Sequence, residues 1–388
     1  ACYTPGMGGI AEAVMKMAFG NGIGFEYSKD ITLEKIFGLS YAGFILELAD
    51  GAEETGTLLG HTNDSGCISL NGESIALSKL LGIYENKLES VYSCNIKNAG
   101  KGAENFSYET VERKAPAIKV AKPRVLIPAF PGTNCDYDTA KAFRKAGAEV
   151  EMSVLCNIGG DDILRSIAEM KEHIRRAHIF VLSGGFSSGD EPDGSAKFIV
   201  NVLNNKDIRE EIHALIDRGG LILGICNGFQ ALVKSGLLPY GRLGMVTKDS
   251  PTLFRNDINR HISQIVTTRV ATTASPWLAG FRLGDLHSIA VSHGEGKFVV
   301  SEELAEELFA NGQVAFQYAD AAGNPTAEAP FNPNGSQYAI EGLVSRNGQI
   351  LGKMGHTERY EPNLFKNIAG NKQQSLFANA VAYFRKVQ

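Results

Sequence analysis

The chain has 388 residues, 44% of them hydrophobic, and a formal net charge of −5. This length is enough for two or three domains with packed cores, and the hydrophobic fraction argues against intrinsic disorder. The acidic balance argues against nucleic-acid binding, and no apolar run reaches the roughly 18 residues that a membrane span needs. No basic residue precedes the apolar part of the N-terminus, so it is a poor signal peptide.

Residues 1–113 are predicted to form a smaller α+β segment. The spacing of Ala, Val, Met and Phe predicts a helix over 8–19, and "YAGFILEL" predicts a strand over 41–48. Residues 70–92 read as a turn followed by a helical region. Two prolines and four basic residues in "RKAPAIKVAKP" indicate a linker over 114–123.

Strands and helices alternate through residues 124–388. Strands are predicted at 124–130, 149–155, 178–185 and 221–226, and helices at 138–148, 161–177, 195–205, 207–220 and 227–236. Strand-like runs follow at 262–270, 288–300 and 338–356, and a helix at 371–387 closes the chain. This order implies right-handed β–α–β units, and hence an α/β fold with a mostly parallel sheet flanked by helices.

The cysteines are Cys2, Cys67, Cys94, Cys135, Cys156 and Cys226. No two form a Cys-x-x-Cys pair, and they are too sparse for a disulfide scaffold, so we expect a reducing, cytoplasmic location. The chain begins without Met inside a segment that reads as structured. We therefore expect a fragment or a processed product of a longer protein.

Cys226 stands in a Gly-x-Cys-x-Gly frame between a predicted strand and a predicted helix, in "GLILGICNGFQALVKSG". Small neighbours allow a sharp turn that exposes the side chain, as in a nucleophile elbow with sulfur in place of oxygen. The N-terminal end of the helix favours a thiolate, and the Asn227 N–H is free to face an oxyanion. The alternative is a buried structural cysteine, which is how we interpret Cys135 and Cys156 because they lack this frame.

A thiolate nucleophile needs a base and a group that orients the base. His356 and Glu358 lie two residues apart after a predicted strand, so an extended chain directs both to the same side. His293, in the glycine-rich "VSHGEGKF", is the rival base. Gly184 and Gly185 follow another strand and could supply a second oxyanion donor, although a plain glycine-rich turn is equally consistent.

Together, "SGGF" at 183–186, "GICNGFQ" at 224–230 and the late His-x-Glu resemble the class I (triad) glutamine amidotransferases, which implies a flavodoxin-like sheet. "PAFPGTNCDYDTAKAF", "HGEGKF" and "NPNGSQYAIEGL" are similar to the glutaminase part of the phosphoribosylformylglycinamidine synthase family. "GMGGIAEAVMKMAFGNGIGFEY" resembles the end of that family's synthetase portion, which is of the aminoimidazole-ribonucleotide-synthetase type.

This resemblance implies that Cys226 attacks the side-chain amide of glutamine and forms a thioester. His356 would then transfer protons, and Glu358 would orient it. It implies oxyanion donors at Gly185 and Asn227, and no metal. It further implies contacts to the substrate from Gln230, His293, Gly184 and Phe186.

The resemblance also implies partners beyond glutamine. The glutaminase step needs no cofactor, and ammonia would pass to a synthetase domain of the same polypeptide or of a partner chain. There ATP and Mg²⁺ support conversion of formylglycinamide ribonucleotide to formylglycinamidine ribonucleotide, a step of purine biosynthesis. Residues 1–113 are too short for the complete ATP site, which we do not expect in this chain. Neither a nucleic acid nor a membrane is expected as a partner.

Other hypotheses stay open. The chain could be a class I glutaminase with another acceptor domain, a thiol hydrolase or peptidase on a related fold, or a docking fragment that is inactive without its synthetase part. Gln230 and the late His-x-Glu favour the amidotransferase over the peptidase. Thr357 stands where the family often has proline, so a looser loop is expected around it.

Overall fold

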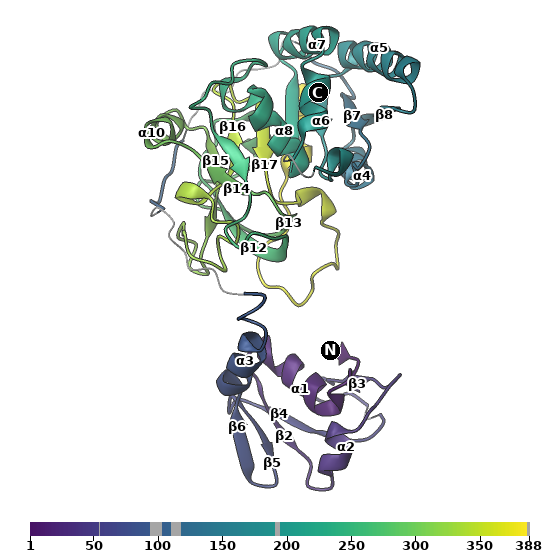
Figure 1. Cartoon of the computed structure of the whole chain (residues 1–388), viewed down its shortest axis with the longest axis vertical. Helices are drawn as coiled ribbons and strands as arrows, with labels where there is room; N and C mark the ends of the chain where they lie inside the picture. Colours follow the sequence, from purple (N-terminus) through teal and green to yellow (C-terminus); the bar gives the residue numbers. More distant parts are fainter. Residues whose placement is uncertain (54, 94–102, 110–117, 191–194, 386–388) are drawn as a thin grey trace. The chain divides into compact units, whose positions relative to one another are not determined.

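The computed structural model describes the chain except residues 54, 94–102, 110–117, 191–194 and 386–388. The chain divides into two compact units, Ala1–Asn95 and Ile96–Gln388, which are described separately (Figure 1). Part of the predicted linker at 114–123 lies outside the described residues.

The second unit includes residues that precede the predicted boundary at 113. The Tyr108 N–H donates to the Ala271 carbonyl, and the Arg269 guanidinium donates to the Phe106 carbonyl and the Ser107 hydroxyl. The segment around Tyr108 therefore packs with the larger unit, and the division between the units falls earlier than the sequence predicted.

The first unit is a small α+β structure around a four-stranded sheet of order β4-β2-β5-β6. Its elements are β1 (Cys2–Tyr3), α1 (Gly9–Phe19), β2 (Gly24–Tyr27), α2 (Leu33–Phe37), β3 (Ile45–Leu46), β4 (Gly60–Asn63), β5 (Cys67–Leu70), β6 (Glu73–Ala76) and α3 (Leu77–Asn86). The apolar stripe of α1 packs Ile10 and Val14 into the core, as its helical spacing predicted. The strand predicted at 41–48 shrinks to β3 because Ala42 has a φ of 60° and the chain turns at Gly43.

The second unit is built on one sheet, with nine strands in the described part of the chain. Five run parallel in the order β8-β7-β9-β10-β17, which is the flavodoxin-like order and confirms the predicted α/β fold. They are β7 (Arg124–Ala129), β8 (Glu149–Val154), β9 (Ile179–Leu182), β10 (Leu221–Ile225) and β17 (Ile350–Lys353). Beyond β17 the sheet continues antiparallel through β16 (Ile340–Val344), β15 (Val314–Ala319), β12 (Ile262–Val270) and β13 (Leu286–His293).

Helices cover the parallel half of the sheet. On one side α4 packs against α11; in a second layer α5 packs against α7, and α6 against α8 (Figure 1). Their bounds are α4 (Asp136–Lys145), α5 (Gly160–Arg176), α6 (Lys197–Leu203), α7 (Lys206–Asp217), α8 (Asn227–Ser235) and α11 (Leu376–Phe384). Smaller elements are α9 (Leu237–Tyr240), β11 (Thr252–Phe254), β14 (Lys297–Val299) and α10 (Glu302–Ala310). Across the described residues, no helix combines the length and apolar character needed to cross a membrane.

The parallel strands place the sequence motifs at one edge. Gly184 follows β9, Cys226 follows β10 and His356 follows β17, and these three strands are neighbours in the sheet. Because the carboxyl ends of parallel strands meet at the same edge, residues far apart in sequence converge there.

Candidate active site

Cys226 occupies the single residue between the end of β10 and the start of α8. Its φ of 52° and ψ of −108° are rarely adopted by a residue with a side chain, and such strain is typical of functional turns. The turn is fixed by a hydrogen bond of 2.8 Å from the Cys226 N–H to the Lys353 carbonyl. A Cβ on Gly228 would lie 1.9 Å from the Leu182 carbonyl oxygen, so only glycine allows α8 to approach β9 this closely.

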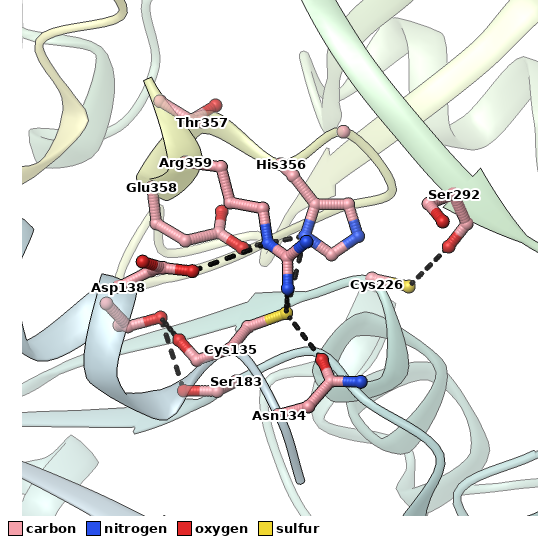
Figure 2. Close-up of polar contacts among 12 residues, drawn as sticks. Asn134, Cys135, Asp138, Ser183, Cys226, Ser292, His356, Thr357, Glu358 and Arg359 are labelled. Carbon is pink, nitrogen blue, oxygen red and sulfur yellow. Dashed lines mark hydrogen bonds and ion pairs between the residues drawn. The ribbon is translucent and has the colours of Figure 1, made fainter. Parts of the chain in front are cut away.

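The Cys226 side chain is buried at the wall of a cavity of about 430 Å³. Its Sγ lies 3.7 Å from the Ser292 carbonyl oxygen (Figure 2). Because Cys226 directly precedes α8, its sulfur lies at the N-terminal end of the helix, where the helix dipole favours a thiolate. The geometry predicted for a nucleophile elbow is therefore present at this residue.

His356 and Glu358 form a buried pair at the end of β17. The His356 Nδ1 lies 2.7 Å from Glu358 Oε1, so we assign the ring proton to Nδ1, which donates to the carboxylate. Figure 2 shows the opposite edge of the ring turned toward Cys226. Burial alone would lower the pKa of His356, but the Glu358 carboxylate and the neighbouring Cys226 and Cys135 sulfurs outweigh burial and raise this pKa well above its usual value.

Gly184 lies behind this pair and is not part of the cavity wall. A Cβ added to Gly184 would lie 2.8 Å from His356 Cε1 and 3.4 Å from Cys226 Cβ, so the nucleophile and the base approach each other across a glycine. The structure thus brings the three motifs of the sequence together, although Gly184 supports the reacting groups from behind.

The rival base, His293, is buried beside the same site. Within the described structure neither of its ring nitrogens has a hydrogen-bond partner. Burial, followed by the nearby His356, lowers the pKa of His293 to about 3, so its ring is neutral at physiological pH. His293 has no carboxylate to orient it, and the geometry therefore favours His356 as the base.

Cys135, interpreted from the sequence as structural, also lies at this site. Its Sγ is 3.8 Å from His356 Nδ1 and accepts a hydrogen bond of 3.3 Å from Arg359 (Figure 2). Cys135, His356 and Glu358 form the one cluster, within the described ranges, whose donor atoms could hold a metal. One sulfur and one carboxylate do not match the oxygen shell that Mg²⁺ requires, and the Arg359 guanidinium opposes a cation next to the sulfur.

Two backbone N–H groups beside Cys226 remain available for an anion. The N–H groups of Gly185 and Asn227 donate to no acceptor in the part of the chain that the structure describes. Gly185 has a φ of 148°, and a Cβ there would lie 2.6 Å from the Gly132 carbonyl oxygen, so the loop requires glycine. The Asn227 side chain accepts from the Ser187 N–H and donates to Asp190 and Gln230, which ties this loop to α8.

The cavity wall contains three of the predicted binding residues, Phe186, Gln230 and His293. The sequence analysis missed Gly189, Asp190, Ser195, Arg255, Asn259, Arg260 and His261, whereas Gly294 and Glu295 belong to the loop of His293, which the resemblance placed at this pocket. Asp190 and Glu295 lie in or beside the glycine-rich motifs, which was a usable signal, whereas the arginines follow β11 in a loop without a motif. The wall thus carries carboxylates and guanidinium groups together, as a zwitterionic ligand requires.

The carboxylates of the wall differ in their environments. Burial raises the pKa of Asp190, although hydrogen bonds from Ala196 and Asn227 oppose this effect. Burial acts in the same direction on Glu295, but hydrogen bonds from Ser195 and the Lys234 ammonium outweigh it and lower its pKa. Glu295 is therefore held as an anion by fixed partners next to the cavity.

Known proteins resemble this chain over the second unit. The pattern of the CobB/CobQ-like glutamine amidotransferase domain matches residues 122–384. The chain is 33% identical to phosphoribosylformylglycinamidine synthase subunit PurQ of Methanococcus maripaludis strain C7, over 69% of this chain and 100% of that protein. It is 35% identical to PurQ of Chlorobaculum tepidum, over 67% of this chain and 98% of that protein. A solved chain of PurLQS from Thermotoga maritima is 25% identical, with a TM-score of 0.49, and matches 68% of this chain and 100% of its own length.

Gly228→Ala should destabilise the second unit, because its methyl group would displace α8 from the Leu182 carbonyl. We expect the free energy of unfolding to fall by about 1–3 kcal/mol, measured by urea unfolding followed through Trp277, which is buried in this unit. Gly160→Ala is the control, since nothing lies within 4 Å of the added Cβ, and should change it by less than about 0.5 kcal/mol. Equal effects of the two substitutions would contradict the close approach of α8 to β9.

A lower pH should reduce the free energy of unfolding of the second unit because of His287. This residue is buried, and its Nδ1 has no partner in the described structure. Burial, followed by the Lys353 charge, lowers its pKa to about 4. The unfolded chain binds this proton near the ordinary value of about 6.5, so this contribution to stability is complete above that pH and is lost as pH falls toward 4.

His287→Phe should remove this pH-dependent contribution to stability, because a phenyl ring keeps the packing on Phe281 without titrating. Between pH 6.5 and 5 the variant should lose about 1.6 kcal/mol less free energy of unfolding than the unsubstituted chain. Urea unfolding at both pH values measures this difference, and parallel losses in the two proteins would show that His287 does not titrate on unfolding.

Proposed function

The chain belongs to the CobB/CobQ-like glutamine amidotransferase family, and from this premise we propose that it hydrolyses glutamine with Cys226 as nucleophile, His356 as base and Glu358 as the orienting group. The observation that carries the proposal is the strained elbow of Cys226, which opens on the cavity beside the buried His356–Glu358 pair. A nucleophile, a base and an orienting carboxylate are the arrangement that acyl transfer requires.

In this reaction His356 takes the proton of the Cys226 thiol, and the sulfur attacks the side-chain amide carbon of glutamine. The carbonyl oxygen becomes an oxyanion, which the free N–H groups of Gly185 and Asn227 stabilise. His356 gives a proton to the leaving nitrogen, ammonia departs, and a γ-glutamyl thioester remains. His356 then takes a proton from water, which attacks the thioester and releases glutamate while the proton returns to the sulfur.

The charged wall of the cavity suits the other end of glutamine. Asp190 and Glu295 can accept hydrogen bonds from the α-ammonium group, and Arg255 and Arg260 can pair with the α-carboxylate. Gln230 reaches the same wall, where its amide donates to the Glu295 carbonyl. A peptide bond removes one or both of these charges, so the wall favours a free amino acid over a peptide substrate.

The curated relatives, named phosphoribosylformylglycinamidine synthase subunit PurQ, support a proposal for the acceptor. Ammonia would serve conversion of formylglycinamide ribonucleotide to formylglycinamidine ribonucleotide on a synthetase domain of the same polypeptide or of a partner chain. ATP and Mg²⁺ would act at that synthetase domain. We propose, on the sequence resemblance, that the first unit, which lies within the predicted segment 1–113, is the end of such a synthetase portion.

We also propose a cytoplasmic location, because the five cysteines that the structure describes are all free thiols. Two alternative functions remain for a chain with this fold. One is a glutaminase that serves a different acceptor, and the other is a docking fragment that is inactive without its synthetase part.

Glutamate release from glutamine tests the proposal. Cys226→Ala and His356→Asn should each lower kcat by at least roughly 10³-fold, because the nucleophile and the base act as one unit. His293→Asn should chiefly raise KM, since His293 lines the cavity but is not the base. A large loss of kcat in His293→Asn, with activity retained in His356→Asn, would exchange the two roles.

An alkylating glutamine analogue should label Cys226 alone among the six cysteines, as measured by peptide mass spectrometry. Cys226 lines the cavity, whereas Cys135 is not part of the cavity wall and its sulfur lies against His356 and Arg359. Labelling at Cys135 would overturn the assignment of the nucleophile. If the chain releases no glutamate but Cys226 is labelled, adding the synthetase part with ATP, Mg²⁺ and formylglycinamide ribonucleotide distinguishes a dependent enzyme from an inactive fragment.

A further inference from the structure

A fully buried ion pair lies beneath the candidate active site. The side chains of Lys353 and Glu341 are both 0% exposed, and Lys353 Nζ lies 3.4 Å from Glu341 Oε1. Lys353 ends β17 and Glu341 lies in the neighbouring strand β16. Because a buried ion pair commonly contributes no more stability than apolar side chains of the same volume, its presence calls for another role.

The remaining hydrogen bonds of this pair go to the turn that carries His356. Lys353 Nζ donates to the Gly355 carbonyl at 2.9 Å and to the Thr357 hydroxyl at 3.1 Å. Glu341 Oε1 accepts from the Gly355 N–H at 2.6 Å. The residues immediately before and after His356 are thus each held by the pair.

Thr357 completes this arrangement on the far side of the turn. Its buried hydroxyl accepts from Lys353 and donates to the Gln374 side chain, so both polar roles of the hydroxyl are used. The looser loop expected from threonine at this position is not what the structure shows, because the hydroxyl ties the turn to two buried partners.

Lys353 also fixes the nucleophile. Its backbone carbonyl accepts the hydrogen bond from the Cys226 N–H that holds the elbow, while its side chain holds the turn of the base. One residue therefore contacts both halves of the reacting pair from below.

We infer that Lys353, Glu341 and Thr357 are positioning residues that set the orientation of His356 toward Cys226. This inference rests on the proposed function. The strands themselves do not need the pair, because Lys353 is already paired through its backbone with Gly342 and Ile225. The charged groups instead direct their hydrogen bonds to the turn, where a small rotation of the imidazole changes its distance to the sulfur.

Thr357→Val tests the inference with little change in volume. We expect kcat for glutamine hydrolysis to fall roughly 10- to 100-fold, because a small displacement of a reacting group has an effect of that size, while KM stays within about twofold. Thr357→Ser keeps the hydroxyl and should retain kcat. Thr268→Val is the matched control: Thr268 is equally buried, on β12, and does not contact the turn, so kcat should be unchanged.

A second variant and a second measurement keep the test independent of glutamine turnover. Lys353→Met combined with Glu341→Leu removes both buried charges together, so neither is left unpaired. The rate at which iodoacetamide alkylates Cys226, measured against pH, reports whether His356 still acts on the sulfur. In both this variant and Thr357→Val we expect the pH midpoint of alkylation to rise, whereas Thr357→Ser and Thr268→Val should match the unsubstituted chain.

Unchanged kcat and an unchanged alkylation profile in Thr357→Val and in the double variant would overturn the inference, even if their unfolding midpoints fall, because the pair would then serve stability alone. A chain without glutaminase activity in any form, even with its synthetase part, would instead overturn the proposed function. The alkylation profiles still decide the positioning role in that case.

Discussion

The close approach of α8 to the ends of β9 and β10 is the constraint on which the rest of the site depends. Gly228 lies so near the Leu182 carbonyl that no side chain fits, and a Cβ on Gly224 would in turn meet the Gly228 carbonyl at 2.6 Å. The chain must therefore pass from strand to helix within one residue, and Cys226 accepts the strained backbone of that turn. The same packing directs the N-terminus of α8 at the sulfur and leaves the Asn227 N–H unbonded in the described structure.

Parallel pairing then brings the other groups to this elbow. β9 and β17 flank β10, so the loops after them carry Gly185 and His356 to the same edge from opposite sides. The antiparallel half of the sheet contributes through β13, whose last residues place the Ser292 carbonyl and His293 against the cavity. The site therefore needs both halves of the sheet, although the parallel half supplies the groups that we assign to the reaction.

The sequence predicted the parts of the fold in which a local pattern decides the structure. The alternation of apolar strands and amphipathic helices predicted β7 to β10 and α4 to α8 closely. The Gly-x-Cys-x-Gly frame predicted the elbow, because a side chain at either glycine would collide with the backbone where α8 meets the strands. The strand β15 (Val314–Ala319) was not predicted, since all six of its residues are buried and no alternation marks it. The part of the cavity wall that carries Arg255 and Arg260 was not predictable either, because this part is a loop without a motif, far in sequence from the rest of the wall.

Two other features of the site carry a signal in the sequence. Lys353 and Glu341 are single charges inside otherwise apolar strands, in "ILGKMG" and "AIEGLV", and such residues must find a partner when buried. The lack of a tight glycine frame predicts a structural role for Cys135, yet the loop after β7 places its sulfur next to His356. A local frame describes a backbone turn, but it does not predict which side chains the topology brings together.

The charged groups that suit a zwitterionic ligand are different residues from the groups that we assign to the reaction. Carboxylates and guanidinium groups line the wall of the cavity, where a zwitterion can be held, while Cys226 lies beside a buried, neutral His293 with a pKa lowered to about 3. An environment that keeps an imidazole neutral also disfavours ammonium, because burial penalises any cation without a partner. In the proposed reaction the leaving nitrogen would thus depart as uncharged ammonia, which is the nucleophilic form that an acceptor requires. The burial that keeps His293 neutral and the uncharged product that the proposed function needs are thus consequences of the same buried environment.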